Sequence, residues 1–117
     1  MLFRVSIVIS LLSLSLTSFS QKEKKKVRLS TGIEMSYIEV GEPGKDALIL
    51  LHGFTDTGRS FYPAIDSLLR ITSDLHIIVP DLRGHGDSSM PDIQQCATAP
   101  EKCFSFIEFA NDVIALM

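Results

Sequence analysis

Two short apolar runs, at 47–51 and 75–80, constrain the fold of this chain more than any other feature. The first reads ALILL and the second LHIIVP, and each is bounded by turn-forming or polar residues. Such continuous runs are typical of strands covered on both faces of a parallel sheet. Between them Ser60 is placed to cap a helix, whose apolar stripe consists of Phe61, Ile65, Leu68 and Leu69. The stretch therefore predicts a β-α-β unit and an α/β fold.

The flanking segments predict further elements of the same fold. Residues 27–29 and 33–40 are β-prone and are separated by a turn that contains Gly32, which favours an antiparallel hairpin. After a loop from 81 to 102, Ser105 and Glu108 have the spacing of an S-x-x-E capping box. We expect a helix there that runs to the end of the chain and has an apolar face formed by Phe109, Val113, Leu116 and Met117.

The first candidate site follows the first apolar run directly. There His52-Gly53-Phe54 would stand at the carboxyl end of a parallel strand, where open α/β sheets bind ligands. Gly53 allows the backbone to approach a substrate, and the N–H of Phe54 could face a developing oxyanion. We expect His52 to hold this loop through hydrogen bonds.

The second candidate site is the segment PDLRGHGDSSM, at 80–90. Its Asp, His and Ser residues are the types found in a serine hydrolase triad. Residues crowded into one glycine-rich turn, however, tend to bond their own backbone. The segment around Ser88 reads G-x-S-x-M and has a bulky Met90 where a nucleophile elbow needs a small residue. We therefore expect a structural turn.

The HG loop and the D-x-R-G-x-G-x-S turn, about 30 residues apart, together resemble the first half of the α/β-hydrolase fold, over about 27–117. The resemblance implies that Phe54 supplies an oxyanion-hole N–H, supported by His52 and Gly53. It also implies a turn that shapes the wall of the active site, formed by Asp81, Arg83, Gly84, His85, Gly86, Asp87 and Ser88. In this family the nucleophile follows the next strand. We therefore identify no catalytic residue in this chain and expect it to be inactive alone.

The resemblance implies the N-terminal fragment of a secreted hydrolase. We expect a serine esterase or lipase-like enzyme that acts on a small ester-like substrate without a cofactor or metal. The alternatives are an epoxide hydrolase or haloalkane dehalogenase with an aspartate nucleophile, and a hydrolase-like binding protein without a triad. Epoxide hydrolases usually carry proline after HGF, where this chain has Thr55.

The N-terminal residues predict a targeting segment before the domain. Residues 1–20 combine Arg4, an apolar run and small residues at the end, which is typical of a cleavable signal peptide. We expect a basic leader at 21–26, an incomplete domain at 27–117, and a secreted or periplasmic protein without a membrane span after cleavage. Lysines just after the apolar run keep a membrane anchor as the alternative. The net charge of −3 argues against a nucleic-acid partner.

The two cysteines, Cys96 and Cys103, lie close together in one polar segment. In a secreted protein such a pair predicts a local disulfide. Two cysteines without paired histidines make a metal site a weak alternative.

Overall fold

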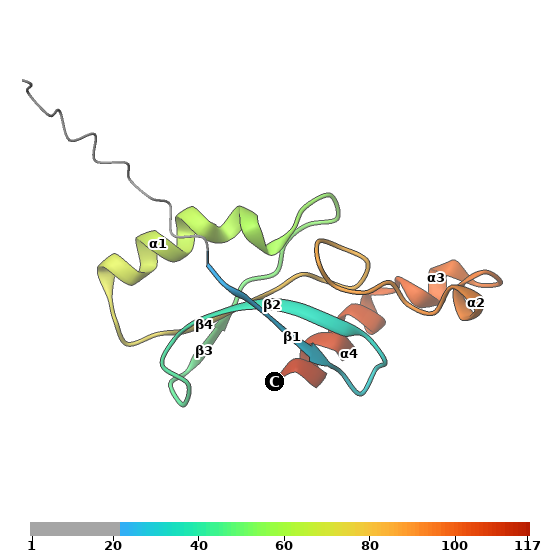
Figure 1. The fold of residues 1–117 in the computed structure, drawn as a ribbon, viewed down its shortest axis with the longest axis horizontal. Coiled ribbons are helices and arrows are strands. Elements are labelled where there is room, and N and C mark those ends of the chain that lie inside the picture. The colour runs from blue at the N-terminus through green and yellow to red at the C-terminus, as the bar shows by residue number, and fades with distance from the viewer. Residues whose placement is uncertain (1–21) are drawn as a thin grey trace, which may run out of the picture.

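A computed structural model describes residues 22–117, so the expected signal peptide lies outside the described residues. The four strands form one sheet in the order β1-β2-β4-β3, with bounds β1 Lys24–Arg28, β2 Glu34–Gly41, β3 Ala47–Ile49 and β4 His76–Pro80. The helical elements are η1 Gly58–Phe61, α1 Tyr62–Ile71, α2 Ile93–Cys96, α3 Pro100–Cys103 and α4 Phe106–Leu116 (Figure 1).

The strand pairings confirm the predicted hairpin and β-α-β unit. β1 pairs antiparallel with β2, and the turn between them is closed by a 2.8 Å bond from the Leu29 N–H to the Ile33 carbonyl. β3 and β4 run parallel on either side of α1 in the sequence, with Leu48 opposite Ile77. The sheet is mixed because β2 pairs antiparallel with β4. This arrangement brings the loops that follow β3 and β4 to the same end of the sheet.

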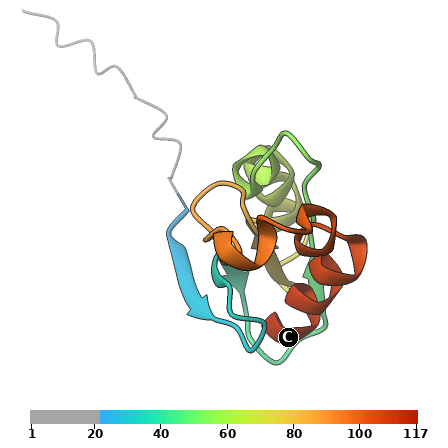
Figure 2. The ribbon, with the colours of Figure 1, turned by 90° about the vertical axis from the view of Figure 1, so that its right-hand side faces the viewer.

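The expected boundary between a basic leader and the domain at residue 27 is wrong. β1 begins at Lys24 and forms the outer edge of the sheet, as Figure 2 shows. The ammonium of Lys24 pairs with Asp81 at 2.5 Å and with Asp87 at 2.8 Å, and Lys25 pairs with Glu39 at 2.6 Å. The lysines thus form ion pairs along an edge strand, where charged side chains also oppose pairing with other chains.

Two small cores lie on opposite faces of the sheet. Met35 and Ile38 stand three positions apart on β2, so their side chains point to different faces. Ile38 packs with Ile65 of α1, whereas Met35 belongs to a cluster against which Leu116 of α4 packs. In Figure 1, α1 accordingly runs above the strands, whereas α4 overlaps the end of β1 in this view. Both helices are therefore held by apolar side chains of the same strand.

The helix ends depart from the sequence expectation in two places. Ser60 does not cap α1; it lies inside the 3-10 turn η1, and Thr57 is the residue that precedes this turn and accepts from the Arg59 N–H at 3.4 Å. Ser105 caps α4 as predicted, by accepting from the Glu108 N–H at 3.3 Å. Met117 is 79% exposed and does not belong to a buried helix face.

Candidate functional site

His52 joins the loop after β3 to the loop after β4. Its ring is 6% exposed, and its Nε2 accepts a 3.0 Å hydrogen bond from the Leu82 N–H. An imidazole nitrogen that accepts carries no proton, so the ring proton lies on Nδ1. Nδ1 then donates to the Gly53 carbonyl at 2.8 Å. His52 thus bonds both to the HG loop and to the loop that follows β4.

The Gly53–Phe54 peptide group is held in one orientation. Its carbonyl oxygen accepts from His52 and from the Asp56 N–H at 3.2 Å. In a planar trans peptide the N–H points opposite to the carbonyl, so these two bonds also orient the Phe54 N–H. Among residues 22–117 this N–H has no hydrogen-bond acceptor, and Phe54 is 83% exposed. The loop therefore presents an oriented backbone N–H that has no acceptor within the described residues.

An apolar cavity adjoins this donor. It has a volume of about 670 Å³ and is lined by the HG loop, Leu82, His85 and one face of α4. Phe54, Phe104 and Phe109 contribute aromatic rings to its wall. The oriented Phe54 backbone therefore lies beside a surface of aliphatic and aromatic side chains.

Asp81 organises the turn after β4. Its carboxylate is fully buried and accepts from the Gly58 N–H at 2.8 Å, the Asp87 N–H at 2.9 Å and Lys24 at 2.5 Å. Burial alone would raise the pKa of Asp81, but these three donors together hold it below its ordinary value. Gly86 has φ +52°, and a Cβ there would lie 2.3 Å from the Asp81 carboxylate. A side chain at 86 is therefore excluded.

Ser88 is bound to backbone groups on both sides. Its Oγ donates to the Asp81 carbonyl at 2.6 Å and accepts from the Ser36 N–H at 2.8 Å. The His85 ring nitrogens contact the carbonyls of Arg83 and Phe54 instead of this hydroxyl. Within the described chain, Ser88 therefore ties the turn after β4 to β2.

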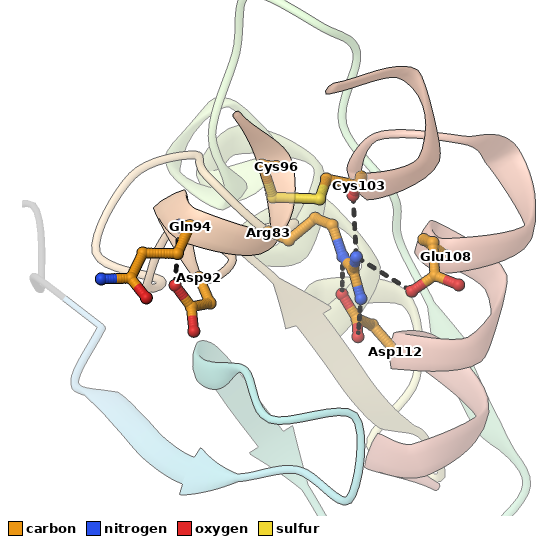
Figure 3. Close-up of a disulfide and its surroundings, with 7 residues drawn as sticks. All are labelled: Arg83, Asp92, Gln94, Cys96, Cys103, Glu108 and Asp112. Atoms are coloured by element: carbon orange, nitrogen blue, oxygen red, sulfur yellow. Dashed lines mark hydrogen bonds and ion pairs between the residues drawn. A yellow bond between two sulfur atoms is a disulfide. The ribbon is translucent and has the colours of Figure 1, made fainter. Parts of the chain in front are cut away.

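Arg83 connects the turn to α4 through a buried ion pair (Figure 3). Its guanidinium, 3% exposed, donates from Nε and Nη2 to both Asp112 oxygens at 2.6 and 2.7 Å. Nη1 donates to Glu108 at 3.1 Å and to the Cys103 carbonyl at 2.8 Å. The hydrogen bonds to Asp112 raise the pKa of Arg83 above its ordinary value despite the opposing effect of burial. Sequence reasoning did not find Asp112; the available signal was a lone carboxylate between the apolar Phe109 and Val113 of an amphipathic helix.

A disulfide closes the loop between the turn and α4. Cys96 and Cys103 are joined at an S–S distance of 2.07 Å, with their Cα atoms 5.7 Å apart. The bond links α2 to α3, as Figure 3 shows, and the carbonyl of Cys103 accepts from Arg83. The disulfide therefore lies one hydrogen bond away from the buried ion pair.

Residues 22–117 contain neither a cluster of metal ligands nor a membrane-spanning helix. Within this range no three His, Cys, Asp or Glu side chains cluster closely enough to hold a metal ion. None of the helices in this part of the chain has the length and apolar character needed to cross a bilayer.

Residues 46–117 match a known protein family. A family model described as the alpha/beta hydrolase fold matches residues 46–117, which span the HG loop, the turn after β4 and α4. The chain belongs to the α/β-hydrolase fold family. The predicted fold, the N-terminal part of an α/β-hydrolase domain, is thereby confirmed.

The curated relatives of this α/β-hydrolase chain include two kinds of hydrolase. Epoxide hydrolase A of Mycobacterium tuberculosis is 36% identical over 63 residues, which cover 54% of this chain and 19% of the relative. Lipase 1 of Psychrobacter immobilis is 36% identical over 72 residues, which cover 62% of this chain and 22% of the relative. The matched part of the chain thus spans about a fifth of the length of each relative.

The solved structures that resemble this chain include epoxide hydrolases. Epoxide hydrolase A of Mycobacterium thermoresistibile superposes with a TM-score of 0.65 at 25% identity, over 82% of this chain and 27% of that one. Potato epoxide hydrolase I superposes with a TM-score of 0.65 at 30% identity, over 80% of this chain and 26% of that one. The sheet and helices described above are therefore the arrangement found in the corresponding quarter of these larger enzymes.

Proposed function

We propose that this chain is the N-terminal part of a hydrolase in which the Phe54 N–H forms part of the oxyanion hole. The observation that carries the proposal is the Gly53–Phe54 peptide, oriented by His52 and Asp56 and with an N–H that has no acceptor among residues 22–117. Such a preorganised donor stabilises negative charge that develops on a substrate oxygen. The nucleophile, acid and base would come from residues outside this chain.

A carboxylic ester is the first substrate class. Attack of a serine hydroxyl on an ester carbonyl produces a tetrahedral oxyanion, which the Phe54 N–H would bind as the C–O bond to the leaving alcohol breaks. The similarity to Lipase 1 supports this class, as does Thr55 at the position where epoxide hydrolases usually carry proline. The apolar cavity beside Phe54 is compatible with a substrate that has a hydrocarbon part.

Epoxide hydrolysis is the second candidate. Its support is the 36% identity to Epoxide hydrolase A and the superposition on epoxide hydrolases of known structure. In that case an aspartate nucleophile opens the epoxide to an ester intermediate, and the oxyanion hole acts when water hydrolyses that ester.

The test uses the complete protein that contains this chain, assayed with p-nitrophenyl butyrate and with styrene oxide. Ester turnover without diol formation supports the first candidate, and diol formation supports the second. Phe54→Pro removes the donor, and loss of one oxyanion-hole donor typically lowers kcat about 10²- to 10³-fold. Phe54→Leu keeps the N–H and is the matched control. Equal activity of the two variants, or no turnover of either substrate, would contradict the proposal.

We further propose that the protein is exported after cleavage near residue 20, with a membrane anchor as the alternative. The support is the apolar N-terminal sequence together with the Cys96–Cys103 disulfide, because disulfides persist mainly in oxidising compartments. Cell fractionation and N-terminal sequencing of the mature protein test this. An uncleaved Met1 in a cytoplasmic fraction would contradict it.

A further inference from the structure

We propose that His85, with protons on both ring nitrogens, is a positioning residue that fixes the Phe54 backbone in its oxyanion-binding orientation. The role assigned to Phe54 rests on the proposed function, but the bridge made by His85 is a property of this chain. The His85 ring belongs to the loop after β4 and faces the HG loop. It lies 5.1 Å from the His52 ring and 5.8 Å from the Phe54 ring, measured between centroids.

Both nitrogens of His85 face backbone carbonyl oxygens. Nδ1 is 2.9 Å from the Arg83 oxygen, and Nε2 is 2.6 Å from the Phe54 oxygen. A carbonyl oxygen only accepts, so each contact requires a proton on the nitrogen concerned. A neutral imidazole has one N–H and satisfies one contact, whereas its other nitrogen then presents a lone pair to an oxygen. The observed bridge is therefore the hydrogen-bonding pattern of the doubly protonated ring.

The bridge completes the support of Phe54. His52 donates to the carbonyl that precedes the Phe54 Cα, and His85 donates to the carbonyl that follows it. Because peptide groups are planar, holding both oxygens fixes the two planes that meet at this Cα. The bonds from His52 and the Asp56 N–H hold the Gly53 oxygen, but neither reaches the Phe54 oxygen. His85 thus removes the remaining backbone freedom beside the exposed N–H.

Other charged groups near the bridge already have partners. Asp81 and Asp87 of the same turn pair with Lys24, and Arg83 pairs with Asp112 and Glu108 of α4. From the HG loop, His52 faces the ring and is anchored as an acceptor of the Leu82 N–H, and Asp56 accepts from the Thr57 N–H.

Within the apolar cavity, the titratable side chains of the lining are those of His52 and His85. Because His52 is already bonded through both nitrogens, the number of protons on His85 decides whether both of the His85 hydrogen bonds can form.

A consequence for pH follows from this geometry. Histidine commonly changes its charge between about pH 5 and 8. The bridge is complete while His85 carries two protons and loses one of its hydrogen bonds when the pH rises and one proton leaves. We expect the Phe54 backbone to be fixed on the low-pH side of this titration and freer on the high-pH side.

The test is an NMR titration of the full chain, labelled with ¹⁵N and ¹³C, across this pH range. We expect the His85 ring ¹⁵N shifts to report two protonated nitrogens at low pH. The Phe54 amide and carbonyl shifts should move with the same midpoint as the His85 ring. A different midpoint, or Phe54 shifts that do not change, would overturn the proposal without the need for any variant.

Two variants sharpen the result. His85→Phe keeps a ring and removes both donors, so the titration of Phe54 should disappear. His76→Gln is the matched control, because His76 lies on β4 and bonds Glu39 at 2.7 Å, away from the HG loop. A Phe54 titration that persists in His85→Phe, or that disappears in His76→Gln, counts against the bridge.

The readout does not depend on turnover. Coupled shifts in a protein that hydrolyses neither ester nor epoxide would uphold the bridge and refute the proposed function. Loss of activity in Phe54→Pro without coupled shifts would support the proposed function and refute the bridge made by His85.

Discussion

Replacement of Asp112 by asparagine tests the energetic weight of the buried ion pair with Arg83. The substitution keeps the size and shape of the side chain and removes its charge. The native carboxylate is fully buried and accepts three bonds: two from Arg83, at 2.6 and 2.7 Å, and one from Thr31 at 2.6 Å. An amide offers one accepting oxygen and turns an NH₂ group toward one of these donors. Arg83 then keeps Glu108 and the Cys103 carbonyl as partners.

The expected loss follows from these contacts. Breaking a buried pair by removing one charged partner costs about 3–5 kcal/mol, because the other charge stays buried without compensation. A domain of this size has a free energy of unfolding of roughly 5–15 kcal/mol. Asp112→Asn should therefore remove a large share of the stability. Replacing both members, in Arg83→Met with Asp112→Leu, should cost less than the sum of the single changes.

Urea unfolding followed by far-UV circular dichroism measures these differences. The matched control is Asp46→Asn, the same chemical change at an exposed residue outside the strands. We expect the free energy of unfolding of this variant to lie within about 0.5 kcal/mol of the wild-type value. A loss below about 1 kcal/mol for Asp112→Asn, or strictly additive double-mutant values, would refute the reasoning.

The remaining predictions concern the turn and the disulfide. Folding lowers the pKa of Asp81. The ionised carboxylate therefore adds to the free energy of unfolding above the pKa of the unfolded state, and this contribution is lost as the pH falls through the lower pKa of the folded state. Urea midpoints below about pH 4 should therefore fall more in the wild type than in Asp81→Asn, and parallel curves would contradict this. Gly86→Ala adds a clash with Asp81 to the backbone strain of about 1–3 kcal/mol, whereas Gly32→Ala, also at positive φ but in open space, should show only the strain. Thermal melts compare the two, and equal losses would argue against the clash. Cys96→Ser with Cys103→Ser should cost about 2–3 kcal/mol in urea unfolding, from the entropy of the short closed loop. No change relative to the wild type would show that the bond does not contribute.

The sequence predicted the strands and helices because their signals are local. The apolar runs at 47–51 and 75–80 need no distant partner to be recognised as strands, and the Ser105 hydroxyl accepts from an N–H only three residues away. Of these two strands, β4 alone is covered on both faces. The expectation of a buried strand at 47–51 is wrong, because β3 lies at the edge of the sheet and Leu48 is 37% exposed. The start of β1 was placed too late because Lys24 has no local strand signal. Its position depends on Asp81, which is 57 residues away in the chain.

Some features of the candidate site can be predicted from the sequence, whereas others appear only in the tertiary structure. The residue types and order of the HG loop and of the turn after β4 are properties of the sequence, and they sufficed to indicate the family. The role of the Phe54 N–H stays a proposal. The bridge from His85 to the Phe54 carbonyl and the pairing of Arg83 with Asp112 were decided only by the tertiary structure. Each of these contacts joins segments about 30 residues apart, and their geometry depends on how β3, β4 and α4 pack. Sequence spacing cannot specify such geometry, because hydrogen bonds require placement within a few tenths of an ångström.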